Sequence, residues 1–324
     1  MKKLVVASTP HIWTKMKTNR IMLDVIIALI PSMIAAAVLF GWRALLLLAV
    51  TVASCIASEW GFQKLLKRKS TIGDLSAVVT GILLAFNFPA DFPLWKAAFG
   101  SFIAIVLVKQ VFGGIGFNLV NPALAARGIL VLTFAQALGS SPATVLTPMV
   151  EVVSSATPLG YLLEGNMGSV PSILDKFLGI HSGAMGETAA FALILGGLYL
   201  VIRKVISPLI PLTFLGTLFA ATALLGQNPG SHLLLGGALL GAIFMATDYT
   251  TIPLTPKGCF IFAVGCGLLT ALIRVFSVFP EGVTFAILIM NLLVPAIDSL
   301  TIKKPFGYKK PEMKKLFSFK KEVA

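Results

Sequence analysis

Long apolar segments separated by short polar connections run along most of the chain. A helix needs about 20 mainly apolar residues to cross the hydrocarbon core of a membrane. Ten segments approach that length: residues 23–40, 44–61, 75–90, 94–112, 122–138, 187–202, 208–226, 233–247, 258–276 and 282–299. The pattern predicts an all-α integral membrane protein with about ten transmembrane helices, because a water-soluble core would not require so many apolar segments.

One long hydrophilic connection, residues 139–186, divides the ten segments into five and five. An odd number of spans in each half would invert the second half relative to the first. Weak internal similarity supports this arrangement, because residues 81–89 and 241–248 are alike and lead on to Pro93 and Pro253, each followed by a new apolar segment. Proline-interrupted segments in paired positions are typical of transporters built from inverted repeats.

The predicted organisation is a single membrane domain that extends over residues 1–324. Its parts are a first five-helix half, an outer loop, a second five-helix half and a basic tail: residues 1–138, 139–186, 187–302 and 303–324. A cleaved signal peptide is not expected, since the first apolar segment begins only after about twenty residues and no small-residue cleavage site follows it.

Composition agrees with a membrane setting, because 57% of the residues are hydrophobic and only 12% are charged. The net charge of +13 could suggest nucleic acid, but the basic residues follow the positive-inside rule, so no nucleic-acid partner is expected. Most of them lie on the face that holds the N-terminus. The opposite face keeps Arg43, Lys96, Arg127, Lys176 and Arg274.

This distribution predicts that both termini are cytoplasmic and that the loop 139–186 lies outside. The lysine-rich tail is interpreted as an orientation signal that also contacts anionic membrane lipid, or else as a docking surface for a soluble partner.

Several polar residues fall inside the interrupted apolar segments, where they need partners within the protein. Asn87, Asn121, Thr247 and Asp248 are therefore candidates for lining an ion or electron path. For Asp248 a structural role is an equal alternative, in which the carboxylate caps a helix near the cytoplasmic surface or pairs with Lys257.

No catalytic or metal-binding pattern stands out in the sequence. Cys55, Cys259 and Cys266 lie in apolar segments without a Cys-x-x-Cys pair, and the three histidines are scattered. No catalytic triad, P-loop or zinc-protease pattern is present. We therefore expect no catalytic acid or base and no bound metal in this chain.

Thr157 lies in the outer loop directly before Pro158, as a helix N-cap would. The free N–H groups and the dipole of a helix N-terminus favour a phosphate there. The surrounding string, Val153 to Leu159, can be an ordinary capped turn or an attachment site for a phosphate-bearing cofactor.

The string Ser154-Ser155-Ala156-Thr157 resembles the covalent flavin site of a family of membrane electron-transfer subunits. This family includes the D subunit of the Rnf complex and the B subunit of the sodium-translocating NADH:quinone reductase. Further segments resemble the family in the same order: residues 8–11 with 18–25, 73–86, 118–123 and 245–251. The resemblance covers residues 8 to about 302, and the short N-terminal arm favours the Rnf branch. Many relatives have proline at the position of Tyr249.

The resemblance implies a subunit of a redox-driven ion translocase in the cell membrane of a bacterium or archaeon. The Rnf complex passes electrons between ferredoxin and NAD and moves Na⁺ or H⁺ across the membrane. FMN would be attached to Thr157 on the outer side by a separate flavin transferase, with Ser154, Ser155 and Ala156 as recognition context. A second, non-covalent riboflavin and contacts with other Rnf subunits are also implied, and the NAD and ferredoxin sites are expected on those subunits.

Two other functions are compatible with the pattern. Inverted five-helix repeats with proline-interrupted segments also resemble urea-channel architecture, so the chain could be a passive channel or transporter. It could also be a redox-inactive scaffold subunit in which Thr157 is an unmodified cap.

Overall fold

The computed structural model describes residues 17–134, 138, 159, 171–277 and 282–303, and helix is the only regular secondary structure within these ranges. The flavin motif Ser154, Ser155, Ala156 and Thr157 lies outside the described residues, as does most of the basic tail. The prediction of an all-α chain is confirmed for the part that the structure describes.

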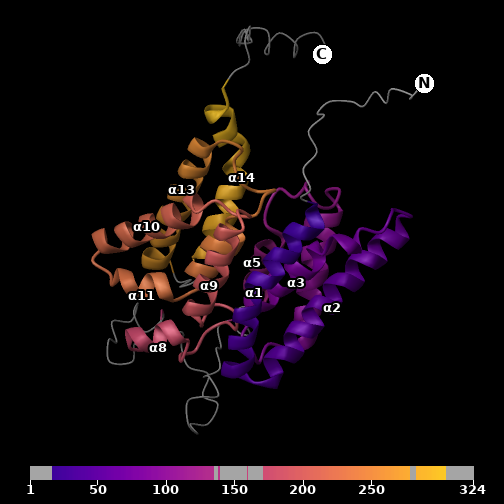
Figure 1. Ribbon diagram of the computed structural model, residues 1–324, viewed down its shortest axis with the longest axis horizontal. Coiled ribbons are helices and arrows are strands. Elements are labelled where there is room, and N and C mark those ends of the chain that lie inside the picture. The colour runs from indigo at the N-terminus through magenta and orange to yellow at the C-terminus, as the bar shows by residue number, and fades with distance from the viewer. Residues whose placement is uncertain (1–16, 135–137, 139–158, 160–170, 278–281, 304–324) are drawn as a thin grey trace, which may run out of the picture.

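The first half forms two long helices followed by shorter ones (Figure 1). Its elements are α1 (Thr18–Phe40), α2 (Trp42–Leu65), η1 (Ile72–Asp74), α3 (Ser76–Phe86), α4 (Leu94–Phe102), η2 (Ile103–Gln110) and α5 (Pro122–Thr133). The π-helical η2 continues α4 without a break, because Ile103 keeps helical backbone angles.

The short helix α8 (Ile173–Leu178) lies in the long connection, and the second half ends with two long helices. The elements of the second half are α9 (Ala190–Ile202), α10 (Leu209–Leu224), α11 (Pro229–Leu234), α12 (Ala238–Leu240), η4 (Gly241–Met245), α13 (Pro256–Phe276) and α14 (Val283–Thr301). The π-helical η4 likewise continues α12.

Each of the ten predicted apolar segments contains helix, but only four of the described helices are long and apolar enough to cross a membrane on their own: α1, α2, α13 and α14. The ten-span count stays a prediction. Two predicted segments differ from their helices. The segment 75–90 ends its helix at Phe86, and the segment 233–247 is interrupted at Gly236 and Gly237, whose φ angles of 65° and 68° no regular α-helix contains.

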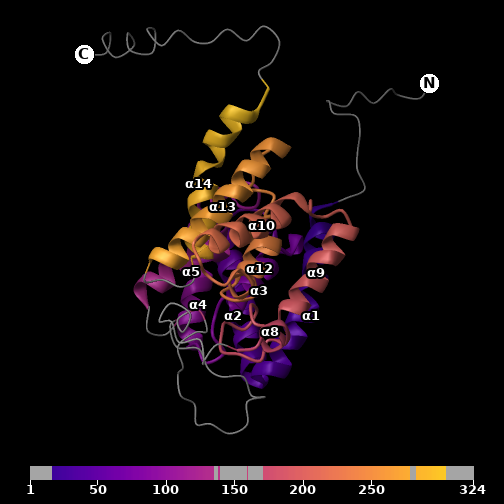
Figure 2. The same cartoon turned by 90° about the vertical axis from the view of Figure 1, so that its left-hand side faces the viewer.

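The two halves pack together through helices from each of them (Figures 1 and 2). Helix α1 contacts α9, and α5 contacts α14. Within the halves, α2 packs against α3 and α4, and α10 packs against α13. The approach of α1 and α9 is close, since a Cβ at Gly196 would lie 2.1 Å from the carbonyl oxygen of Ala28. One buried hydrophobic cluster combines residues from both halves.

The two ends of the bundle hold different elements. The beginning of α1 and the end of α14 lie at one end, and α8 lies at the other (Figure 1). Large apolar side chains on the outward faces of the long helices are exposed, among them Val38 and Leu292. Such surfaces are suited to lipid, where backbone groups must be satisfied within helices.

Candidate functional site

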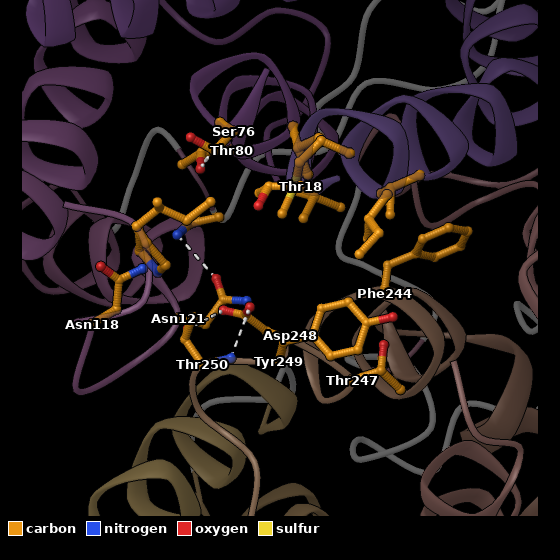
Figure 3. A pocket seen from close by; sticks show the side chains of 18 of the residues that line it. Thr18, Ser76, Thr80, Asn118, Asn121, Phe244, Thr247, Asp248, Tyr249 and Thr250 are labelled. Atoms are coloured by element: carbon orange, nitrogen blue, oxygen red, sulfur yellow. Dashed lines mark hydrogen bonds between the residues drawn. The ribbon is translucent and has the colours of Figure 1, made fainter. Parts of the chain in front are cut away.

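A cavity of about 370 Å³ opens near the beginning of α1, between the two halves. Its walls come from α1, α3, η2 and the connection before α5 on one side, and from residues 200–206, η4 and the residues after it on the other. Figure 3 shows side chains from these separate elements around the same space. The polar or charged residues at the cavity are Thr18, Ser76, Thr80, Lys109, Asn118, Asn121, Thr247, Asp248 and Thr250, with Tyr249 beside them.

Asn121 connects the two halves at this cavity. It is the N-cap of α5, and its side-chain oxygen accepts hydrogen bonds from the amides of Ala123 at 3.0 Å and Leu124 at 3.3 Å. Its Nδ2 donates to the carbonyl oxygen of Met245, the last residue of η4, at 3.3 Å. The Asn-Pro pair therefore starts a helix and holds the opposite half in register.

Thr247 and Asp248 come two and three residues after the end of η4 and line the same cavity. The Thr247 hydroxyl donates to the carbonyl oxygen of Ile243 at 2.6 Å. The Asp248 carboxylate accepts from the hydroxyl of Thr250 at 3.2 Å, and no ion pair joins it to Lys257, whose side chain is exposed. Three of the four predicted path residues, Asn121, Thr247 and Asp248, thus share one site.

Asn118 and Lys109 also line the cavity, and neither was predicted for this role. The Oδ1 atom of Asn118 is buried and has no hydrogen-bond partner, so it is an acceptor available to a ligand. Lys109 is only 2% exposed, and the Glu59 carboxylate lies 3.0 Å from its Nζ. Its ammonium also donates to the Ser76 hydroxyl at 2.5 Å.

The carboxylate of Glu59 is itself fully buried and accepts several further hydrogen bonds. Gln110 donates at 2.8 Å, Thr71 at 3.0 Å and Gln63 at 3.2 Å. Glu59 and Lys109 are 50 positions apart in the sequence. No local sequence pattern indicates that they form a pair, so the sequence alone does not predict this network.

Asn87, the fourth predicted path residue, lies deeper than the cavity. It follows the end of α3, and its Nδ2 donates to the carbonyl oxygen of Leu83 at 2.6 Å. Its Oδ1 accepts a hydrogen bond from Nη1 of Arg127. The Sδ atom of Met245 lies 4.0 Å from its Nδ2, so the C-terminal ends of α3 and η4 meet here.

The segment before α9 covers the end of α3. The amides of Gly186 and Met185 donate to the carbonyl oxygens of Phe86 at 3.1 Å and Phe88 at 3.0 Å. This part of the predicted outer loop is therefore packed inside the bundle. The pairing also brings Glu187 inside, where it is 5% exposed and its Oε1 accepts from the amide of Ala184 at 3.1 Å.

A second buried group of polar residues surrounds the break at Gly236 and Gly237. Arg274 has no exposed surface, and its guanidinium donates to the carbonyl oxygens of His232, Leu235 and Gly236. Arg127 and Arg274 are both buried inside the protein, where amide and carbonyl oxygens accept their hydrogen bonds. Their position near the outer face of the membrane stays a prediction.

His181 and Lys176 lie in the same region. Burial lowers the pKa of His181, so the imidazole is held in its neutral form. The Lys176 ammonium donates to the Ser231 hydroxyl at 2.7 Å, which joins α8 to α11.

Leu159 lies against this second group. It is 2% exposed and packs on Leu235, and a Cβ added to Gly236 would lie 2.2 Å from its Cδ1. Leu159, two positions after Thr157 in the sequence, is therefore part of the folded body.

A known protein family matches most of this chain. The model of the NQR2, RnfD, RnfE family matches residues 5–307. The chain belongs to this family.

Similar relatives include members of ion-translocating complexes, matched over nearly their whole length. The chain is 47% identical to the D subunit of the Na⁺-translocating ferredoxin:NAD⁺ oxidoreductase complex of Acetobacterium woodii, over 95% of this chain and 96% of the relative. It is 38% identical to the D subunit of the proton-translocating ferredoxin:NAD⁺ oxidoreductase complex of Clostridium ljungdahlii, over 93% and 96%. It is 39% identical to the D subunit of the ion-translocating oxidoreductase complex of Stutzerimonas stutzeri, over 89% and 92%.

Proposed function

We propose that this chain is a flavin-bearing membrane subunit of a complex that couples electron transfer between ferredoxin and NAD to the movement of Na⁺ or H⁺. The observation that carries the proposal is the 47% identity to the D subunit of such a complex along nearly the whole of both chains. The other subunits of the complex would supply the ferredoxin and NAD sites. One relative is named for Na⁺ and another for protons, so the proposal covers both ions. Transport measurements on the complex would identify the ion that it moves.

FMN joined through its phosphate to Thr157 is the first redox group of this proposal, with Ser154, Ser155 and Ala156 as the string read by a flavin transferase. Two residues of chain span at most about 7 Å, so Leu159 would keep the attached phosphate close to Gly236. The buried guanidinium of Arg274 lies next to Gly236, and its positive charge would suit the anionic phosphate. The flavin would supply reversible electron acceptance, and the chain would hold and orient it.

The attachment predicts a specific result for Thr157→Ala. The complex made with its flavin transferase should show flavin fluorescence on this subunit in a denaturing gel, and the variant should lose it. Peptide mass analysis should find FMN on the peptide that contains Thr157. Thr144→Ala, in the same predicted loop but outside the string read by the transferase, is the matched control and keeps the attachment hydroxyl. A fluorescent Thr157→Ala band would contradict the site, whereas full complex activity without flavin would support the scaffold function.

We propose this cavity as the site of the second, non-covalent riboflavin. Ligand pockets of about 300 to 1,000 Å³ usually combine apolar walls with a few polar groups. The walls here include Leu83 and Phe244, and the polar groups include the unpartnered Asn118 Oδ1 and the Asp248 carboxylate. These oxygens would accept hydrogen bonds from a flavin N–H or ribityl hydroxyl, while apolar walls would exclude water from the ring.

Non-covalent flavin content tests this assignment. Acid extraction of the purified complex should release riboflavin, and Asn118→Leu should lower its amount at least about tenfold, because filling the acceptor position removes a hydrogen bond and space together. Covalent FMN should be unchanged. Ser299→Ala, on the exposed end of α14, is the control and should retain riboflavin. Wild-type riboflavin content in Asn118→Leu would rule out this cavity.

Ten spans arranged as an inverted repeat complete the proposed architecture. In both halves the third apolar segment contains a short helix, α3 or α12 with η4, and the pairs α1 with α9 and α5 with α14 relate equivalent positions. With both termini cytoplasmic, the cavity would face the cytoplasm and Leu159 the outer side. An alkaline phosphatase domain is active only outside the cytoplasm, so a domain fused after residue 302 should be inactive. An active fusion would show that the orientation is the reverse of the proposed one.

A further inference from the structure

The buried ion pair of Glu59 and Lys109 lies within two of the predicted apolar segments. Glu59 is in the segment 44–61 and Lys109 is in the segment 94–112, and neither side chain is more than 2% exposed. Ionisable residues inside a membrane are costly, and where they occur they commonly pair with one another and mark ion pathways or proton relays. A buried ion pair is also a weak source of stability compared with apolar packing. The pair therefore indicates a role other than holding α2 against η2.

A continuous row of hydrogen bonds leads through this pair from the protein surface to the cavity. It begins at Thr71, an exposed residue whose hydroxyl donates to Glu59 Oε1 at 3.0 Å. The Glu59 carboxylate accepts from the Lys109 ammonium at 3.0 Å, and that ammonium donates to the Ser76 hydroxyl at 2.5 Å. Ser76 and Lys109 both line the cavity, and Figure 3 shows Ser76 at its wall. We name Thr71, Glu59, Lys109 and Ser76 the relay row.

Neighbouring hydrogen bonds hold the two ends of the relay row in place. At the surface, Gln63 donates to the Thr71 hydroxyl at 2.7 Å, which leaves the Thr71 proton directed at Glu59. At the cavity, the Ser76 hydroxyl donates to Asp74 Oδ1 at 2.5 Å. This hydroxyl can therefore turn toward a ligand in the cavity by exchanging one acceptor for another.

We propose that the relay row delivers protons from the surface at Thr71 to the riboflavin that we place in the cavity. The inference rests on that proposed site, because reduction of a flavin requires protons as well as electrons. Apolar walls would exclude water from a ring bound there, so the proton has to come from a protein group at the wall. Positioned side chains commonly transfer protons in this way.

Each proton that leaves the relay row is replaced from water. The Ser76 O–H bond breaks as its proton passes to the ligand, and the Lys109 ammonium gives a proton to the Ser76 oxygen. Glu59 returns a proton to Lys109 after it receives one from the Thr71 hydroxyl, which takes one from water. The row ends with the protons that it had at the start, and one proton has moved from water to the ligand. The matching electron comes from the proposed electron flow of the complex.

Rapid mixing of the purified complex with reduced ferredoxin tests the relay row, with riboflavin absorbance and a proton-sensitive dye followed together. Thr71→Val removes the hydroxyl at the entrance, and Ser76→Ala removes the hydroxyl at the exit. Each should slow riboflavin reduction and proton uptake at least about tenfold, since a positioned proton donor commonly contributes about 10²- to 10⁴-fold. The solvent deuterium isotope effect should rise, because proton transfer becomes the slow step. In Thr71→Val the riboflavin content and its equilibrium midpoint potential should stay unchanged, because a relay affects the rate and not the equilibrium.

Two control variants keep the relay row intact. Thr71→Ser retains the entrance hydroxyl and should keep the wild-type rate. Thr51→Val removes a hydroxyl from the same helix as Glu59, but that hydroxyl donates to the Leu47 carbonyl oxygen outside the row, so the rate should again be that of wild type.

The outcomes separate the relay from the flavin site. Thr71 is exposed, so Thr71→Val decides the matter if Ser76→Ala fails to assemble. A wild-type rate in either assembled variant with full riboflavin content would overturn the proposal, because protons would then reach the cavity by another route, such as Asp74 or the mouth of the cavity. A wild-type complex without extractable riboflavin would contradict the flavin site itself, and the relay row would lose its acceptor.

Discussion

Several charged side chains of this protein are buried away from water, among them Glu59 and Lys109. Glu59 and Lys109 form an ion pair in which both side chains are at most 2% exposed. A buried pair adds little net stability compared with well-packed apolar residues, but removing one partner leaves the other charged and unsolvated.

The first prediction concerns that pair. Glu59→Gln should destabilise the protein by roughly 3 to 5 kcal/mol, because the Lys109 ammonium loses its carboxylate. Thermal unfolding in detergent should show a clearly lower midpoint. The double variant Glu59→Leu with Lys109→Met should recover much of the loss, since it removes both charges. Equal midpoints for Glu59→Gln and wild type would mean that Lys109 is not charged in the folded protein.

At the scale of the helix, the break between α11 and α12 is the element that most depends on special residues. Gly236 and Gly237 both adopt left-handed angles, and both lie against buried charged side chains. A side chain here would be strained by its backbone angles and would also meet Arg274 or Glu187.

Alanine at these two glycines should therefore lower stability. Gly237→Ala should lower the free energy of unfolding by about 1 to 3 kcal/mol, because its backbone would be strained and its Cβ would meet Glu187. Thermal unfolding measures this loss. Gly236→Ala should in addition lower covalent FMN loading, because its Cβ would displace Leu159. Gly216→Ala is the matched control. Its Cβ would meet nothing within 4 Å inside α10, and it should be neutral or stabilising. A Gly237→Ala protein as stable as Gly216→Ala would contradict the strain at the break.

At the scale of the whole molecule, the two halves form one body. Buried residues from both halves belong to a single hydrophobic cluster, and hydrogen bonds from Asn121 to Met245 and from Tyr199 to Asp24 cross between them. The end of the long connection joins this body too, because Met185 belongs to the same cluster.

We expect the halves to assemble without a covalent link. Co-expressed fragments 1–166 and 167–324 should purify together through a tag on either one, because α1 with α9 and α5 with α14 supply the interface. Gly196→Leu should abolish co-purification, since even its Cβ would approach the Ala28 carbonyl oxygen to 2.1 Å. Gly216→Leu, on the same fragment, should not. Separation of the unmodified fragments would show that the connection holds the halves together.

The hydrophobic pattern placed helix within each of the ten apolar segments, and it set the start of one segment at Pro122, where α5 begins. These features depend on residues close together in the chain, namely apolar length, capping side chains and proline positions. It also placed Asn121, Thr247 and Asp248 among the residues to examine, because polar groups in apolar segments are costly without partners.

Only the tertiary structure decided which of these residues meet. It placed Asn118, Lys109 and Asp248 around one cavity, paired Lys109 with Glu59, and set Arg127 between Asn87 and Glu187. It also interrupted the predicted segment 233–247 at two glycines. The physical reason is that these contacts join residues about 40 to 160 positions apart, so they depend on how the helices pack and not on any local pattern.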